Sequence, residues 1–158
     1  MKRVLALSIA LVCVIFVCSC DGAKKEDAQQ YVFRYNGVDI SCHADMSEII
    51  SRIGQPISYS ASPSCAAVGE DKLYTYGGFR IVTCPDGEID RICRIELRSD
   101  LVSTPEGAAV GMSETEVISI YGEGFEKNAP GLSYSSDNCR LRILLRDGTV
   151  TGVIYEAV

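Results

Sequence analysis

The chain has 158 residues, of which 47% are hydrophobic and 23% are charged, and this composition is typical of globular rather than disordered proteins. With 15 basic against 21 acidic residues and a formal net charge of −6, it lacks the basic surface of nucleic-acid-binding proteins and any attraction to anionic lipid. The length predicts one domain or two small ones.

The first 19 residues have the pattern of an export signal. Lys2 and Arg3 give a positive start, and the stretch 4–17 is apolar except for Ser8. This stretch is shorter than the about 20 residues that span a bilayer, and it has the usual length of a signal-peptide core. A short transmembrane anchor is the alternative. We therefore expect residues 1–19 to be a leader that is removed.

The end of the leader resembles a bacterial lipobox. That pattern has an aliphatic residue, a small residue directly before the cut and an obligatory cysteine after it, and Val17, Ser19 and Cys20 occupy these positions. The resemblance implies that the thiol of Cys20 carries a diacylglycerol as a thioether, and two or three acyl chains hold a protein firmly on a membrane. Residues 20–30 then form the lipidated cysteine and a polar tether. The predicted location is the extracytoplasmic face of the cell membrane.

Two similar helix signals follow in the rest of the chain. The segment 49–54 (IISRIG) recurs as 117–122 (VISIYG). Asp45 precedes the first copy and Ser113 the second, and each is followed three positions later by a glutamate, which is the pattern of a capping box. Each copy ends in glycine, the residue favoured at a helix C-terminus. We expect a short helix of about ten residues in each copy.

Alternating apolar and polar residues after each helix predict antiparallel strands. The expected strands are 72–76, 79–84, 89–98, 132–136, 139–146 and 149–157, with a further hairpin around Asn36-Gly37. The predicted fold class is therefore α+β, a tandem repeat of a short helix packed on an antiparallel β-meander in one sheet-and-helix layer architecture. The two expected repeats are 31–99 and 100–158.

Several runs resemble known families. The stretches PSCAAVGEDKLYTYGGF (63–79) and STPEGAAVGMSETEVISIYG (103–122) resemble uncharacterised lipoproteins of Gram-positive gut anaerobes. The run 111–127, followed by DGTVTGVIYE (147–156), is similar in pattern to the SmpA/OmlA and β-lactamase-inhibitor-protein-like (BLIP-like) superfamily. This resemblance implies a helical segment on an antiparallel sheet, often in tandem. It also implies a non-catalytic role, in envelope assembly or in occupying the cleft of another protein.

The chain has eight cysteines. Cys13 and Cys18 lie in the predicted leader, and the thiol of Cys20 is predicted to be acylated. An odd number of thiols remains, so one is expected to be free or paired with another chain. The remaining thiols are Cys42, Cys65, Cys84, Cys93 and Cys139.

A bridge between Cys42 and Cys65 is the preferred pairing, because both lie in irregular segments that flank the first helix. Cys84 and Cys93 lie on neighbouring strands but are expected to be out of register, beyond the about 7 Å between Cα atoms that a disulfide allows. Cys93 and Cys139 are expected to be buried thiols.

The residues give no catalytic or metal-binding pattern. His43 is the single histidine and no C-x-x-C pair is present, so a structural zinc site is not expected. The neighbouring pair Cys42 and His43 cannot easily aim both side chains at one reacting atom. We expect no enzyme activity, no cofactor and no metal; a nucleophilic Cys65 is the alternative, and it requires a lowered thiol pKa.

The first repeat has an insertion at 55–71 with small residues, two prolines and a cysteine. Ordered surface loops on a rigid scaffold often carry binding, so Tyr59, Pro63, Ser64 and Cys65 are the candidate partner-binding residues; a passive insertion is the alternative. The predicted function is a non-enzymatic interaction module of the cell envelope that binds another envelope protein or a surface ligand. The alternative function is an inhibitor of a secreted or cell-wall hydrolase, with 55–71 as a plug.

Overall fold

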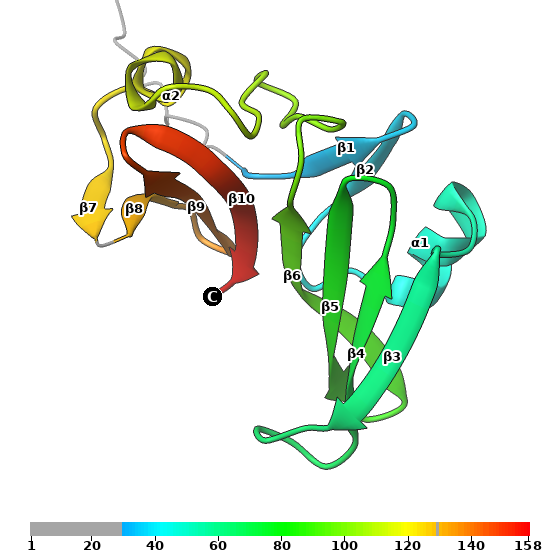
Figure 1. Cartoon of the computed structure of the whole chain (residues 1–158). Coiled ribbons are helices and arrows are strands. Elements are labelled where there is room, and N and C mark those ends of the chain that lie inside the picture. The colour runs from blue at the N-terminus through cyan, green and yellow to red at the C-terminus, as the bar shows by residue number, and fades with distance from the viewer. Residues whose placement is uncertain (1–29, 129) are drawn as a thin grey trace, which may run out of the picture.

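The fold is dominated by one antiparallel sheet of eight strands. The structure, a computed structural model, describes residues 30–128 and 130–158. The sheet has the strand order β3-β4-β5-β6-β10-β9-β8-β7, and a separate hairpin is formed by β1 and β2 (Figure 1). The predicted leader, Cys20 and residues 21–29 lie outside the described residues.

The elements follow each other in the chain as hairpin, helix, four strands, helix, four strands. Their bounds are β1 (Phe33–Tyr35), β2 (Val38–Ile40), α1 (Met46–Ile53), β3 (Ser58–Pro63), β4 (Glu70–Thr75), β5 (Phe79–Asp86), β6 (Ile89–Leu97), α2 (Glu114–Tyr121), β7 (Glu126–Asn128), β8 (Gly131–Ser135), β9 (Cys139–Arg146) and β10 (Thr149–Ala157). Both predicted helices and the hairpin around Asn36-Gly37 are confirmed, and the six predicted strands correspond to β4, β5, β6, β8, β9 and β10 within a few residues.

The predicted fold class is wrong. The structure is mostly β, because the helices α1 and α2 contribute only 8 residues each. The expected three-stranded meanders are not separate units either, since β6 pairs with β10 and makes one continuous sheet of all eight strands. Two strands were also missed: β3 forms in the segment expected to be a loop, and β7 adds a short outer strand.

The seam between β6 and β10 is the centre of the sheet. It comprises the antiparallel pairs from Val153↔Leu97 to Glu156↔Arg94. On the inner face of these strands Ile95, Leu97, Val153 and Tyr155 are at most 1% exposed. Burying a large apolar side chain stabilises a fold by about 1.5–3 kcal/mol, so this seam carries much of the core.

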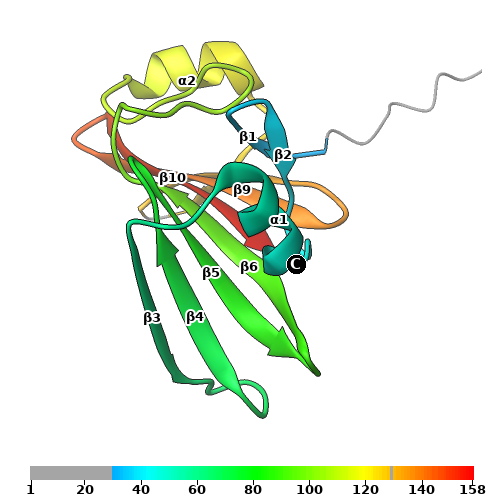
Figure 2. The same cartoon turned by 90° about the vertical axis from the view of Figure 1, so that its right-hand side faces the viewer.

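Each helix is joined to the last strand of its half by backbone hydrogen bonds. The N–H of His43, before α1, donates to the Ile92 carbonyl of β6 at 2.7 Å. The N–H of Glu114, in α2, donates to the Gly148 carbonyl beside β10 at 2.9 Å. Asp45 and Ser113 cap the two helices as predicted, and the full capping box is present at Ser113. Figure 2 shows α2 and the β1–β2 hairpin above the fan of strands, with α1 in front of the strands.

Two tyrosines secure the helix ends against the sheet. The hydroxyl of Tyr76 donates to the Gly54 carbonyl after α1 at 3.1 Å, and that of Tyr134 donates to the Gly122 carbonyl after α2 at 3.0 Å. These bonds satisfy carbonyl groups that a helix C-terminus leaves without an internal partner. The β1–β2 hairpin adds Phe33, which is fully buried with its ring 5.0 Å from that of Phe79.

Alkaline pH is predicted to unfold the protein. Burial raises the pKa of Tyr155, Tyr121 and Tyr31 above the ordinary value of 10.0. A raised folded-state pKa contributes stability that is complete below the unfolded pKa and is lost as pH rises above it, because the unfolded chain then binds fewer protons. Denaturant unfolding from pH 8 to pH 11 should show stability falling above about pH 10.

The matched variant for this experiment is Tyr155→Phe, which keeps the ring and removes the ionisable hydroxyl. We expect it to lose less stability than the wild type over the same pH range. Equal losses in the two proteins would contradict the assignment of this effect to Tyr155.

Candidate functional site: the open edge of the sheet

The two edges of the sheet differ in length and chemistry. At one edge β7 has three residues and carries Glu126 and Lys127, and short, charged strands protect an edge against unwanted pairing. At the other edge β3 has six residues, SYSASP, all exposed and without a charge. Among the described strands, β3 pairs only with β4, so its outer side is open.

The register shows which backbone groups of β3 face outward. The N–H of Ser64 donates to the Gly69 carbonyl at 3.0 Å, and the pairing runs from Pro63↔Glu70 to Ser58↔Thr75. In an antiparallel pair the hydrogen-bonded residues alternate, so Ser60 and Ser62 point their N–H groups at β4. The N–H groups of Tyr59 and Ala61 therefore point away from the sheet. Pro63 lies at an outward position, where a missing N–H breaks no ladder bond.

Exposed apolar side chains are spread along this edge. Five large apolar side chains are exposed in the described part of the chain, and three of them, Ile57, Tyr59 and Val68, belong to β3 or its flanks. Val68 is 100% exposed in the turn after β3. The ring of Tyr59 lies 5.2 Å from that of the buried Tyr74, which holds it over the strand.

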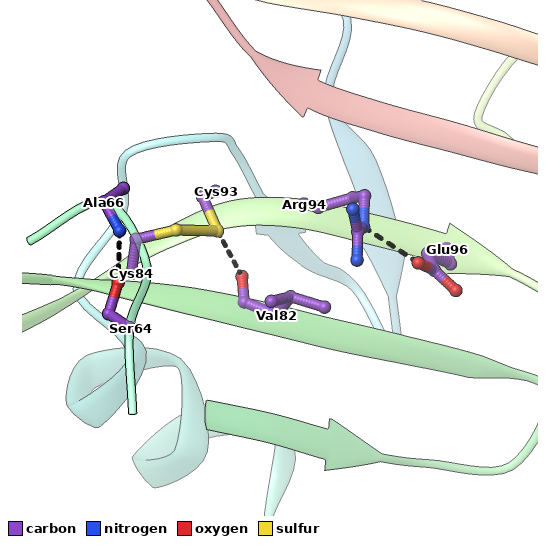
Figure 3. The surroundings of a disulfide bond; sticks show 7 residues. All are labelled: Ser64, Ala66, Val82, Cys84, Cys93, Arg94 and Glu96. Atoms are coloured by element: carbon purple, nitrogen blue, oxygen red, sulfur yellow. Dashed lines mark hydrogen bonds and ion pairs between the residues drawn. A yellow bond between two sulfur atoms is a disulfide. The ribbon is translucent and has the colours of Figure 1, made fainter. Parts of the chain in front are cut away.

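The turn 64–69 rests on the end of β5. Gly69 has a φ of +131°, and a Cβ at this position would lie 2.9 Å from the Cβ of Pro85. Glycine is therefore required both by the backbone conformation and by the close approach. The neighbouring Cys84 is bonded to Cys93, as Figure 3 shows, so the strand end that supports the turn is covalently held to β6.

The Cys84–Cys93 disulfide corrects the expectation that these residues are out of register. Val82 pairs with Arg94, but the next pair is Thr83↔Ile92, so Cys93 is the extra residue of a β-bulge. A bulge changes the direction in which the following side chains point. The Cα atoms of the two cysteines are 5.8 Å apart, within the range of a disulfide. Cys93 is therefore not the buried free thiol that the sequence suggested.

The expected bridge between Cys42 and Cys65 is absent from the described residues. Cys65 is an exposed free thiol in the turn 64–69, because the pairing of β3 with β4 carries it to the tip of the hairpin. Cys42 is buried, and its sulfur lies 3.3 Å from that of Cys139. The burial of Cys139 is confirmed. Tyr59, Pro63, Ser64 and Cys65 do lie together on β3 and its turn, although most of 55–71 is hairpin rather than loop.

A shallow depression adjoins β3 on the outer face of the sheet. It has a volume of about 320 Å³ and is lined by residues of β3, β4, β5 and β6, among them Ser60, Ser62, Leu73, Val82, Arg80 and Arg94. At its floor Glu96, whose side chain is only 10% exposed, pairs with Arg80 and Arg94 at 2.8 Å each and with Arg98 at 3.8 Å. The lining carries the cations Lys72, Arg80 and Arg94 and the carboxylates Asp71 and Glu96, which leaves a small excess of positive charge beside the open edge.

Other kinds of site have less support in the structure. The described residues contain no group of three or more histidine, cysteine, aspartate or glutamate side chains placed to hold a metal ion. His43 has a positive φ of 66° and uses its backbone N–H to bind β6. In the same part of the chain, neither helix has the length and apolar character that crossing a membrane requires.

Comparison with known proteins gives a similarity of fold. No protein-family model and no curated protein matches the chain, so the resemblance to the SmpA/OmlA and BLIP-like superfamily stays a prediction. The crystal structure of an extracellular protein containing a SCP domain from Bacillus anthracis str. Ames has a similar fold, with a TM-score of 0.54 and 8% sequence identity. The similarity covers 73% of this chain and 44% of that one, so this chain corresponds to less than half of that protein.

Removal of the Cys84–Cys93 disulfide is predicted to destabilise the fold. The bond joins residues 9 positions apart, and closing a loop of that size stabilises a protein by about 2–3 kcal/mol. The double variant Cys84→Ala/Cys93→Ala should lose about that much free energy of unfolding in denaturant titrations. The exposed Cys65→Ala should unfold like the wild type. Equal stability of the double variant and the wild type would contradict the role of the bond.

Proposed function

We propose that this chain is a lipid-anchored protein of the extracytoplasmic membrane face and that it binds another envelope protein by adding an extended segment of that partner to β3. The observation that supports the binding mode is the open edge strand β3, whose six residues are all exposed and uncharged. Strand addition to an exposed edge is a common mode of protein recognition. The anchor is supported by Val17, Ser19 and Cys20 at the end of the leader.

The chemistry of the edge suggests what the partner segment contains. Its backbone would bond to the outward groups of Tyr59 and Ala61, and each such hydrogen bond adds a net of about 0.5–1.5 kcal/mol. On one face an apolar side chain would cover Tyr59. On the other face, above the depression, an acidic side chain would meet Arg80 or Arg94, since guanidinium groups bind carboxylates in a two-point geometry.

The polar segment after Cys20 fits this arrangement. An extended chain reaches about 3.3 Å per residue, so residues 21–30 would let the folded part stand on the order of 30 Å from the membrane. The open edge could then reach the domains of neighbouring envelope proteins.

The anchor is tested by metabolic labelling. Cells that express the full chain and are fed a radioactive fatty acid should label the wild-type protein and release it only with detergent. The variant Cys20→Ala should carry no label, because no thiol remains for the thioether. Cys65→Ala serves as the matched control and should be labelled like the wild type. Persistent labelling of Cys20→Ala would contradict a lipid anchor at this residue.

The binding edge is tested by photo-crosslinking in intact cells. A photoreactive phenylalanine analogue in place of Tyr59 should yield a defined crosslinked product, whereas the same analogue in place of Lys127, on the opposite edge, should not. Ala61→Pro removes one outward N–H but no bond to β4, so it should reduce the product roughly two- to twelvefold. Ala61→Val keeps the N–H and serves as the matched control.

The folded state of each variant is checked by its melting temperature. Crosslinking that is equally strong from residues 59 and 127, or that is unchanged by Ala61→Pro in a folded protein, would contradict binding at β3.

A second function, inhibition of a secreted or cell-wall hydrolase, is favoured by one observation. The turn 64–69 protrudes beyond β3 with Val68 fully exposed at its tip, a shape that could enter a cleft. The crosslinked partner separates the two functions. A hydrolase that loses activity when the chain is added in equal amount would identify an inhibitor, and a partner without such loss would favour simple binding.

A further inference from the structure

Two buried cysteines of the described residues lie against each other without a bond. Cys42 follows β2, and Cys139 is the first residue of β9. Their side chains are 8% and 2% exposed, and their sulfur atoms are 3.3 Å apart, with the Cys42 thiol donating to the Cys139 sulfur. They are separated by 97 positions in the chain. Packing in the core, rather than a local turn, therefore brings the two thiols together.

The gap between the sulfur atoms is small compared with other possible pairings. A disulfide bond is about 2.05 Å long, so the two sulfur atoms would have to approach by roughly 1.3 Å to form one. The other cysteines in the described part of the chain are poor disulfide partners for Cys42 or Cys139. Cys84 and Cys93 already bond each other, and Cys65 is exposed on the turn 64–69.

We propose that Cys42 and Cys139 form a second disulfide, which ties the N-terminal hairpin to the C-terminal half of the sheet. The oxidant is an external disulfide, either a small molecule or a thiol–disulfide exchange protein. One thiolate attacks that disulfide and releases its first thiol, and the second cysteine then displaces the other. Two S–H bonds are lost and one S–S bond forms, while the two electrons and two protons leave on the two thiols of the reduced oxidant.

A depression borders both cysteines and is the side from which such an oxidant would approach them. It has a volume of about 300 Å³, and its lining includes both cysteines together with Gln30, Tyr31, Ser41, His43 and Asn138. The hydrogen bond from Cys42 lowers the pKa of Cys139 and raises that of Cys42. The thiolate, which is the form that reacts, is thereby favoured on Cys139.

The position of the pair suggests what the bond would do. Gln30, at the start of the described residues, lines the same depression as Cys42 and Cys139, so the bond would lie where the predicted tether enters the fold. A covalent link there would prevent the N-terminal segment from peeling away from the sheet. With this bond formed, Cys65 is the one odd thiol among the five beyond the lipobox. The inference is independent of the proposed binding at β3.

The experiment follows disulfide formation in the purified full chain. The protein is reduced, equilibrated with mixtures of glutathione and glutathione disulfide, quenched with acid, and alkylated under denaturing conditions. Digestion without reductant should release a Cys42–Cys139 linked peptide pair in oxidising mixtures, whereas Cys65 should be recovered alkylated or as a mixed disulfide with glutathione, without a link to another cysteine of the chain. The variants Cys42→Ala and Cys139→Ala should each leave the remaining cysteine of the pair without a link to another cysteine of the chain.

Thermal unfolding supplies a second readout. In the Cys84→Ala/Cys93→Ala background, the oxidised protein should melt on the order of 10 °C above its reduced form, because the new bond closes a long loop. Adding Cys139→Ala should abolish this difference. The proposal is overturned if both cysteines stay alkylated in mixtures that close Cys84–Cys93 in the wild type, or if either one is recovered linked to Cys65.

Discussion

The pairing of β6 with β10 determines the rest of the architecture. Four antiparallel residue pairs, from Val153↔Leu97 to Glu156↔Arg94, join two four-stranded halves into one sheet. The inner side chains of this seam are almost fully buried beneath the β1–β2 hairpin and the helices. The seam also orders the strands outward from the centre, so that β3 and β7 become the edges.

The two edges of the sheet differ in chemistry, and the proposed binding at β3 rests on this difference. In the seam, the backbone N–H and C=O groups of β6 and β10 bond to each other. Among the described strands of this sheet, unpaired backbone groups therefore remain on the outer sides of the edge strands β3 and β7. β7 is short and carries charges, whereas β3 is long and uncharged. The bulge at Cys93 places the disulfide at the end of β5, beside Pro85 and the turn 64–69. The exposed turn 64–69 therefore contacts a strand end that the Cys84–Cys93 disulfide links to β6.

The sequence predicts the local structure well and the long-range structure poorly. Capping residues at Asp45 and Ser113 locate both helices, because a helix start depends on a few neighbouring residues. The β6–β10 seam joins strands that are far apart in the chain, and a local sequence pattern does not indicate such a pairing. Residues 58–63 (SYSASP) do alternate polar and apolar side chains, but the small residues and the two prolines of 55–71 favour a loop, which explains why the sequence predicts no strand there. The bulge at Cys93 shifts the register by one residue, and this shift makes the disulfide possible.

Backbone hydrogen exchange of the full chain tests the central claim, one continuous sheet with an open edge at β3. The account predicts that the amides of the β6–β10 seam exchange most slowly, at the rate of global unfolding. It also predicts that the outward amides of Tyr59 and Ala61 exchange fast while those of Ser60 and Ser62 are protected. Seam amides that exchange through a separate local opening, or equal protection of all four β3 amides, would contradict it.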